Sequence, residues 1–231
     1  MESKKVAVIM PTYNNEEYLA EAIESVLRQS YKNWRLVVIN DGSTDGTEQI
    51  LEFYRDKYKN ISTIHSILNE GIAMSRNKGI WLLDDVDYIA VADADDLLHP
   101  DRLKKQVALL EKSKVDFVYS SYYTANEEAV IENNQWVLPK NKLTYKGVID
   151  GYTAPHVTIM AKARCIKDNP YRNELRVNDD MALVLDWLKA GYTYKRIKQP
   201  LMIVRYHMQS VSKLKDKEVK KSIEELKKEF L

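Results

Sequence analysis

This sequence has too little cysteine, too even a charge and too few long hydrophobic runs for several classes of protein. Its single cysteine, Cys165, excludes an intrachain disulfide framework and a zinc site built from cysteines. Lysine and arginine total 35 against 34 aspartates and glutamates, whereas nucleic-acid-binding domains usually carry a clear basic excess. The apolar run at residues 6–10 is too short for a signal-peptide core, and no run approaches the ~18 residues of a membrane span. We therefore expect a soluble, cytoplasmic protein, no binding of nucleic acid, and at most a peripheral place at the inner face of a membrane.

Glycine is also scarce, with seven in 231 residues. Four of the seven lie within residues 41–47 and 69–79. Glycine adopts backbone conformations that other residues avoid, so these two segments are expected to contain such turns. No G-x-G-x-x-G pattern occurs, which removes the dinucleotide-binding fingerprint.

What the chain does contain is an ordinary globular composition, 45% hydrophobic and 30% charged. Its early apolar runs do not alternate with polar residues, which is typical of strands buried on both faces of a parallel sheet. Helical periodicity lies between them, so the sequence predicts an α/β fold with a mostly parallel central sheet flanked by helices. The predicted strands are residues 6–10, 36–39, 61–67 and 88–92, and the helices between them are 16–29, 45–58 and 72–81.

The second half of the chain has weaker patterns. Residues 125–155 show no sustained period and are expected to form loops and short strands over one edge of the sheet. The tail from residue 215 predicts a solvated helix that packs one apolar stripe. No repeat or linker divides the chain, so residues 1–231 are predicted to form a single domain. The other predicted elements are helices at 101–112 and 180–190 and strands at 117–122 and 201–206.

Two polar segments follow directly after predicted strands. Pro11 is expected to end the first strand, so Thr12, Tyr13 and Asn14 would lie beyond its carboxyl end, where open α/β sheets bind ligands. A turn in which Asn14 or Asn15 caps the next helix would explain the same residues. Asp41 follows the second strand into the same crevice, where its carboxylate could accept hydrogen bonds from a base or a ribose.

The loop after Asp41 has a structural explanation of its own. Asp45 and Glu48 have the spacing of a capping box at the start of a helix, in which the first caps the helix and the second reaches back. Asp41 lies outside that pattern and remains a candidate for function.

Three carboxylates crowd the segment after the strand at 88–92. Asp93 and Asp95 are two residues apart, so on an extended backbone both would point to one face, and Asp96 adds a third charge. Without a partner at least one of these groups would have a raised pKa. A divalent cation resolves the conflict, and a few oxygen ligands suit Mn²⁺ or Mg²⁺ that also holds substrate phosphates. An acidic loop in which Asp96 caps a turn is the structural alternative.

Three later sites are ambiguous from spacing alone. Arg76, after a glycine turn, could meet a phosphate or lie solvated at the surface. Asp179 and Asp180 open an apolar-periodic helix, where they could favour the helix dipole or supply a general base for an attacking hydroxyl. His207 follows the last strand and could ligate a metal or contact a phosphate, although a lone histidine more often does neither.

Taken together, these segments resemble the inverting family 2 glycosyltransferases of the GT-A fold. The similarity is strong over residues 4–122 and looser over 156–212. It implies a nucleotide-sugar-binding half at 1–122, an acceptor and catalytic half at 123–212, and a C-terminal helix at 213–231. The segments that carry the resemblance are residues 11–14, 41–47, 69–71 with 76–79, the DXD motif within 93–96, and 179–180.

The resemblance also implies a role for each candidate. Asp180 matches the family's catalytic aspartate, and Asp41 matches the aspartate that reads the base of the donor. Asp95, as the last aspartate of the DXD motif, would hold Mn²⁺ or Mg²⁺ against the diphosphate. The implied substrate-binding residues are Thr12, Tyr13, Asn14, Asp41, Arg76, Asp93 and Ala94, and the implied metal ligands are Asp95 and His207.

The implied reaction moves one sugar from a nucleotide-diphosphate sugar, most commonly a UDP-sugar, to a hydroxyl of a glycan or lipid-linked acceptor. The chain lacks the Gln-x-x-Arg-Trp motif and the membrane spans of processive polysaccharide synthases, which points to single transfers. Trp136, Tyr145 and Tyr152 could stack on the sugars of an acceptor or simply pack. A capsule or lipopolysaccharide precursor, a lipid-linked oligosaccharide or a protein would all serve as acceptor, and a homodimer stays open.

Two other functions are weighed against this one. A sugar nucleotidyltransferase usually carries a glycine-rich phosphate loop early in the chain, and residues 6–14 contain no glycine. The second is a nucleotide-sugar-binding module that has lost activity, and the intact Asp93, Asp95 and Asp180 argue against such a loss.

Overall fold

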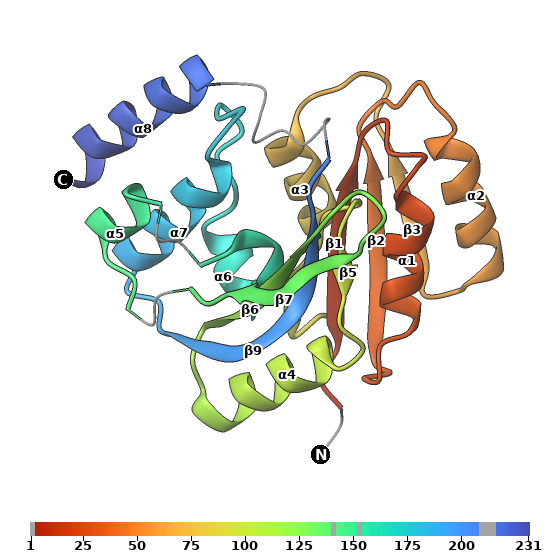
Figure 1. The fold of residues 1–231 in the computed structure, drawn as a ribbon, viewed down its shortest axis with the longest axis horizontal. Coiled ribbons are helices and arrows are strands. Elements are labelled where there is room, and N and C mark those ends of the chain that lie inside the picture. The colour runs from red at the N-terminus through yellow and green to blue at the C-terminus, as the bar shows by residue number, and fades with distance from the viewer. Residues whose placement is uncertain (1–2, 140–141, 152–153, 208–215) are drawn as a thin grey trace.

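The computed structural model describes residues 3–139, 142–151, 154–207 and 216–231, and it is built around one mixed sheet (Figure 1). The strands follow the order β3-β2-β1-β4-β8-β6-β9-β5, and β7 pairs with β6 beside that path. The strands are β1 (Val6–Thr12), β2 (Trp34–Asn40), β3 (Ile61–His65), β4 (Tyr88–Val91), β5 (Leu97–Leu98), β6 (Phe117–Ala125), β7 (Ile131–Val137), β8 (Met160–Lys162) and β9 (Tyr194–Arg205).

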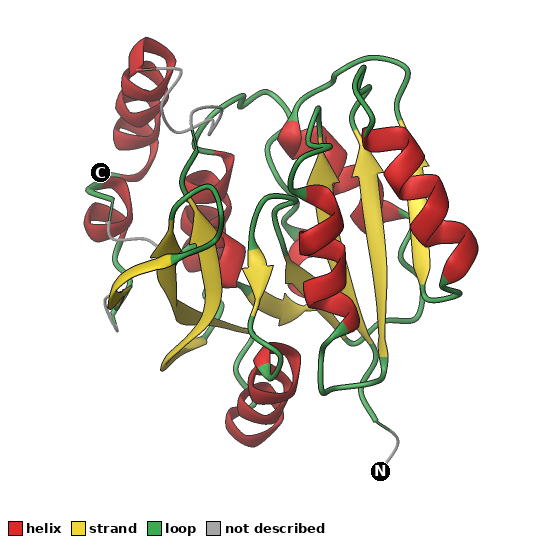
Figure 2. Cartoon of the chain, turned by 45° about the vertical axis from the view of Figure 1, so that its right-hand side comes forward, coloured by secondary structure: helices red, strands yellow, loops and turns green. Residues whose placement is uncertain are grey.

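Helices cover both faces of this sheet (Figure 2). A short 3₁₀ helix, η1 (His156–Thr158), precedes β8. The α-helices are α1 (Leu19–Leu27), α2 (Thr47–Lys57), α3 (Ile72–Trp81), α4 (Arg102–Ser113), α5 (Tyr145–Ile149), α6 (Ala163–Asp168), α7 (Asp179–Lys189) and α8 (Asp216–Phe230).

The first half confirms the predicted parallel sheet. Strands β1, β2, β3 and β4 pair in parallel, and all seven residues of β1 are buried. Alternate residues of β1 enter two different cores: Val8 packs with α1 and α2, whereas Ile9 packs with α3. Burial on both faces explains why these strands appear in the sequence as continuous apolar runs.

The strand at the N-terminus does not end at Pro11, as the sequence predicted, but runs on to Thr12. Pro11 pairs with Ile39 of β2, while the last residue of β1 paired with β4 is Ile9. The Thr12 carbonyl accepts the N–H of Asp41 on the β2 side. Backbone groups of successive strand residues point to opposite sides, so the position where Pro11 lacks an N–H faces β4, which has already ended there. A proline there costs the sheet no hydrogen bond.

The second half of the sheet mixes directions. Strand β8 is antiparallel to both β4 and β6, β9 is parallel to β6, and β5 is antiparallel to β9. The predicted strand at 201–206 is much longer, because Tyr194–Arg205 pairs along β6. The segment at 125–155 contains the edge strand β7, as expected, and a helix, α5, that was not predicted.

The C-terminal helix packs as its apolar stripe predicted. Leu226 is buried, and Ile223 and Phe230 pack against the core beside α5 and α7 (Figure 1). Tyr145 contacts Phe230 with ring centroids 5.6 Å apart, so its ring packs within the fold. Trp136 lies half-exposed against Tyr123, and the third aromatic candidate, Tyr152, lies outside the described residues. Across the described part of the chain, no helix is both long and apolar enough to cross a membrane.

Candidate functional site

The loops after β1 and β2 brace one another at the carboxyl edge of the sheet. Asn14, with φ of +48°, accepts the N–H of Thr44 at 2.8 Å, and its own N–H donates to Ser43 Oγ at 2.9 Å. Asn14 therefore supports the neighbouring loop and does not cap the next helix. Tyr13 is 49% exposed, while Thr12 Oγ1 is buried with no hydrogen-bond partner among the described residues.

The predicted capping box forms only in part. Asp45 Oδ1 accepts the N–H of Thr47 at 3.1 Å, and Oδ2 accepts that of Glu16 at 3.0 Å. These hydrogen bonds outweigh desolvation and lower the pKa of Asp45. Glu48 does not reach back, because its carboxylate lies 3.6 Å from His65 Nδ1 on β3.

Asp41 is buried at the end of β2 and holds a turn from elsewhere in the chain. Its two oxygens accept the N–H groups of Glu70 and Gly71 at 3.0 and 2.9 Å. Burial raises the pKa of Asp41 above its ordinary value, and the Gly71 hydrogen bond opposes that rise. An ionised carboxylate has about four acceptor sites, so these two bonds leave acceptor capacity on Asp41. The glycine turn at Gly71, with φ of +97°, thus serves to bring main-chain N–H groups to Asp41.

The three crowded carboxylates lie on a turn after β4, whereas the prediction that Asp93 and Asp95 share one face assumed an extended backbone. Asp96 N–H donates to the Asp93 carbonyl at 3.3 Å, which closes the turn. Asp93 then meets Arg76, while Asp95 meets His207. Asp96 is buried and accepts the backbone N–H of Arg205 at 2.9 Å, so its carboxylate satisfies a backbone group at the end of β9.

The electrostatics of this turn follow from its burial. Desolvation, with the charge of Asp93 added, raises the pKa of Asp95, and the hydrogen bond from His207 opposes this. Desolvation also raises the pKa of Asp96 well above its ordinary value, and the charges of Asp95 and Asp93 add to the effect. The turn therefore concentrates negative charge at low solvent exposure and is suited to bind a cation.

Arg76 is buried and connects the two halves of the site. Its Nη2 donates to Asp93 at 2.9 Å, and its Nη1 donates to Asp179 at 2.7 Å. The guanidinium also lies over the ring of Tyr171, 5.3 Å from the centroid. Burial alone would lower the pKa of Arg76, but the charges of Asp179 and Asp93 outweigh it and raise that pKa. The solvated alternative for Arg76 is thereby excluded.

Asp179, predicted only as a helix-start residue or base beside Asp180, proves to be a partner of Arg76. This residue starts α7, next to Asp180, and its buried carboxylate is bound to Arg76. Asp180 accepts the N–H of Met181 at 2.8 Å and lies half-buried. Desolvation, with the charge of Asp179 added, raises the pKa of Asp180 to about 6. A carboxylate with such a pKa is suited to accept a proton near neutral pH.

His207 and Arg205 come to the same place from the end of β9. His207 Nε2 lies 2.9 Å from Asp95 Oδ2, and its ring contacts Tyr18 at 4.8 Å. Arg205 is buried beside the turn and donates from Nε to the Asp95 carbonyl at 3.0 Å. The structure thus brings Asp93, Asp95 and His207 together, and Arg76 joins them to the start of α7. Ala94 lies buried within the turn.

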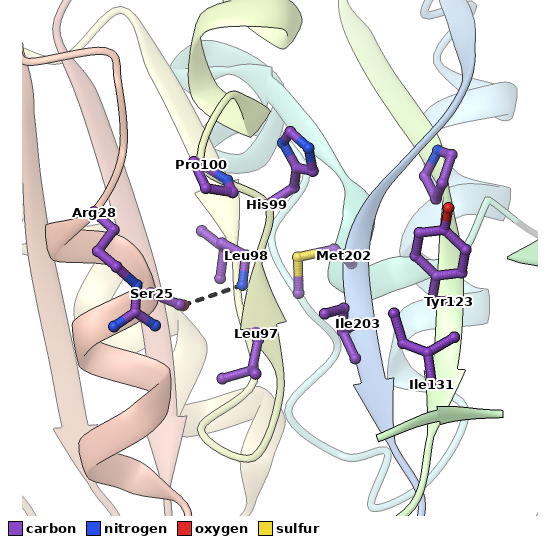
Figure 3. A pocket seen from close by; sticks show the side chains of 11 residues that line it. Ser25, Arg28, Leu97, Leu98, His99, Pro100, Tyr123, Ile131, Met202 and Ile203 are labelled. Atoms are coloured by element: carbon purple, nitrogen blue, oxygen red, sulfur yellow. Dashed lines mark hydrogen bonds between the residues drawn. The ribbon is translucent and has the colours of Figure 1, made fainter. Parts of the chain in front are cut away.

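A cavity of about 330 Å³ lies elsewhere, between α1, β5 and β9 (Figure 3). Leu97, Tyr123 and Ile203 are among its lining side chains, and Ser25 accepts the N–H of Leu98 at its wall. The lining holds none of the candidate residues, so the site described above is an edge of the sheet and not this cavity.

Comparison with known proteins identifies relatives of the chain. A family model described as Glycosyl transferase family 2 matches residues 7–164. The chain is 37% identical to the putative glycosyltransferase EpsE of Bacillus subtilis over 206 residues, covering 87% of this chain and 73% of that protein. It is 28% identical over 224 residues to an Escherichia coli protein named UDP-Glc:alpha-D-GlcNAc-diphosphoundecaprenol beta-1,3-glucosyltransferase WfgD, covering 96% of this chain and 85% of WfgD.

Solved structures with similar folds include two with bound ligands. S. aureus TarS in complex with UDP-GlcNAc aligns with a TM-score of 0.74 at 21% identity, covering 89% of this chain and 60% of the TarS chain. The mannosyltransferase PcManGT from Pyrobaculum calidifontis, in complex with GDP-Man and Mn²⁺, aligns with a TM-score of 0.68 at 15% identity, covering 90% of this chain and 59% of that chain. At these identities the likeness concerns the fold.

Proposed function

Because this chain belongs to glycosyl transferase family 2, a glycosyltransferase with the GT-A fold as its sequence predicted, we propose that it transfers one sugar at a time with inversion of configuration. The donor is a nucleotide-diphosphate sugar, and we assign uridine as its base. The acceptor is a hydroxyl of a glycan or lipid-linked glycan. One observation carries the proposal: Arg76 joins Asp93, in the donor half, to Asp179, the neighbour of the base Asp180.

The donor lies along the carboxyl ends of β1, β2 and β4. Asp41, buried with acceptor sites to spare, is the partner for the N–H of the base, and Tyr13 is exposed beside it. Thr12 offers a buried hydroxyl without a partner in the described chain. The names of two relatives support uridine: TarS was solved with UDP-GlcNAc, and WfgD is named for UDP-Glc.

A divalent cation fits the residues between Asp95 and His207. A carboxylate oxygen and an imidazole nitrogen, 2.9 Å apart, are donors that Mn²⁺ accepts. No group of three or more histidine, cysteine, aspartate or glutamate side chains is arranged to hold a metal within the described residues. The diphosphate of the donor would therefore complete the coordination, as is usual for Mn²⁺ and Mg²⁺ in phosphate sites. The bound cation supplies charge neutralisation on the departing diphosphate.

Asp180 acts as the general base. Its carboxylate takes the proton from the acceptor hydroxyl, whose oxygen forms the new bond to the anomeric carbon as the bond to the diphosphate breaks on the opposite face. The pKa of about 6 keeps Asp180 ionised at neutral pH and makes it a stronger base than an ordinary aspartate. No covalent bond to the enzyme forms, which is the inverting outcome.

Arg76 acts through its two carboxylates. It holds Asp93 toward the sugar of the donor and fixes the first residue of α7, so that Asp180 keeps its position relative to that sugar. A guanidinium suits this place because its planar fork can bond two carboxylates at once, which a lysine ammonium does less well.

Product analysis tests the proposed reaction. The enzyme is incubated with UDP-sugars and Mn²⁺, and released UDP is measured with and without candidate glycan acceptors. We expect UDP release from at least one UDP-sugar, lost in Asp180→Asn. Pyrophosphate release from UTP and a sugar phosphate would instead support a nucleotidyltransferase. Binding of UDP-sugars without release of either product would support a module without activity.

A further inference from the structure

Arg205 binds the turn at residues 93–96, the acidic turn, although the proposed function gives Arg205 no role. It is the last residue of β9 and is 5% exposed. Its backbone N–H donates to Asp96 Oδ1 at 2.9 Å, and its Nε donates to the carbonyl of Asp95 at 3.0 Å. One residue thus holds both the side chain of Asp96 and the main chain of Asp95.

The guanidinium is itself fixed from two further directions. Nη1 donates to the carbonyl of Glu127 at 2.7 Å, and Nη2 donates to the carboxylate of Glu21 at 2.7 Å. The plane lies over the ring of Tyr18, 4.6 Å from its centroid. Three in-plane bonds and one stacked ring leave the guanidinium a single orientation, and a lysine ammonium cannot reproduce that geometry.

The same contacts bring His207 to Asp95. His207 lies two residues beyond Arg205 on the same chain segment, and Tyr18, which stacks on Arg205, also contacts the His207 ring at 4.8 Å. The distance of 2.9 Å between His207 Nε2 and Asp95 Oδ2 therefore depends on how closely Arg205 joins the end of β9 to the acidic turn.

We propose that Arg205 is a positioning residue that sets Asp95 and His207 as a preformed pair for the divalent cation of a nucleoside diphosphate. This inference rests on the proposed function, since it takes the pair as the cation site. Arg205 touches neither cation nor substrate; it acts by holding the two ligands at one distance, and a site held in place binds more tightly than one that must be ordered on binding.

The test is a titration of Mn²⁺ at saturating UDP, with free Mn²⁺ followed by electron paramagnetic resonance. We expect Arg205→Lys to weaken Mn²⁺ binding at least tenfold. The matched control is Arg102→Lys, another fully buried arginine, which bonds the carbonyls of Val91 and Ile159 and makes no hydrogen bond to the acidic turn. Arg102→Lys should lower stability but leave Mn²⁺ affinity within about twofold, because lysine keeps the positive charge near Asp96 and Asp93 and no hydrogen bond to the turn is lost.

A second, milder pair of variants tests the inference even if Arg205→Lys does not fold. Glu21→Ala removes one exposed partner of Arg205, and Glu24→Ala, on the same helix, removes a partner of Arg28. We expect Mn²⁺ affinity to fall two- to threefold in the first and to stay constant in the second. Wild-type affinity in Arg205→Lys or in Glu21→Ala overturns the inference and leaves the proposed function standing. Absence of UDP-dependent Mn²⁺ binding in the wild type overturns both the cation site and the inference.

Discussion

Arg76 and Asp179 form a buried ion pair between residues 103 positions apart in the chain, with Nη1 and Oδ2 at 2.7 Å. Arg76 lies on α3, beneath the donor half of the site, and Asp179 is the first residue of α7. Arg76 also bonds Asp93, so a bridge of three residues, Asp93, Arg76 and Asp179, crosses the site. The bridge gives a structural reason why Asp93 and the start of α7 lie at one edge of the sheet.

Removing the centre of this bridge should be costly. Arg76→Met leaves two carboxylates without their cation, and breaking a buried pair from one side typically costs about 3–5 kcal/mol. We expect a loss of about 3 kcal/mol in the free energy of unfolding, measured with urea. Arg76→Met/Asp179→Leu should recover part of the loss, because one uncompensated charge is gone. Strictly additive losses in the double variant would contradict the bridge.

Asp180→Asn should remove the base while leaving the donor site intact. General-base catalysis typically contributes about 10²–10⁴-fold, so we expect kcat to fall at least a hundredfold, with UDP affinity unchanged by calorimetry. Asp186→Asn is the control on the same helix, since Asp186 pairs with Arg172. An Asp180→Asn enzyme with near-normal kcat would remove Asp180 from the mechanism.

The pH dependence of the reaction should report the pKa of Asp180. Burial first, and then the charge of Asp179, raise that pKa to about 6. A base works only when deprotonated, so kcat/KM should be constant above pH 7 and fall tenfold per unit below about pH 6. Initial rates at saturating Mn²⁺ across pH 5–8 measure this. A profile that stays flat down to pH 5, as expected for an aspartate with the ordinary pKa of about 4, would contradict the assignment.

Substitution of two glycines with nearly equal φ can distinguish the effect of backbone strain from the effect of a steric clash. Gly42 has φ of +75° and Gly191 has φ of +76°, so alanine is strained at both, by roughly 1 kcal/mol. At Gly42 a Cβ would also lie 2.8 Å from the Leu68 carbonyl carbon, whereas Gly191 has nothing within 4 Å. The chain at Leu68 leads into the turn that bonds Asp41.

Gly42→Ala should therefore weaken UDP binding about tenfold in addition to lowering stability, because the turn at Glu70 and Gly71 must shift. Gly191→Ala should lower stability alone. Urea unfolding and UDP calorimetry on the two variants distinguish these effects. Equal UDP affinity in both variants would show that the turn does not shape the donor site.

The parts of the fold that the sequence predicted well are those with local causes. Strands β1, β2 and β4 are buried on both faces, so their apolar runs are continuous and visible. Helix α3 has the predicted bounds, because Gly71, at φ of +97°, marks its start.

The missed elements have causes far away in the chain. Strand β5 has two residues and β8 three, too few for any pattern, and each exists because a distant strand pairs with it. The first half of β9 is polar and largely exposed, so only its pairing with β6 makes it a strand.

In the site, too, local features were predictable from the sequence and long-range contacts were not. The sequence placed Asp41, Asp93 and Asp95 after strands, and each lies at the expected edge. The sequence could not show which side chains meet at this edge, because the contacts join distant residues. Arg76 reaches Asp179 across 103 residues, and Arg205 reaches Asp96 across 109 residues. The prediction for Asp93 and Asp95 assumed an extended backbone, whereas the chain turns there.

Calorimetric titration of UDP, GDP, ADP and dTDP, with and without Mn²⁺, tests the central claim most directly. Wild type and Asp95→Ala are compared, since Asp95 faces His207 in the acidic turn. We expect UDP binding that is strengthened by Mn²⁺ in the wild type and loses that metal dependence in Asp95→Ala. No metal-dependent binding of any of the four nucleotides would contradict the donor site described above.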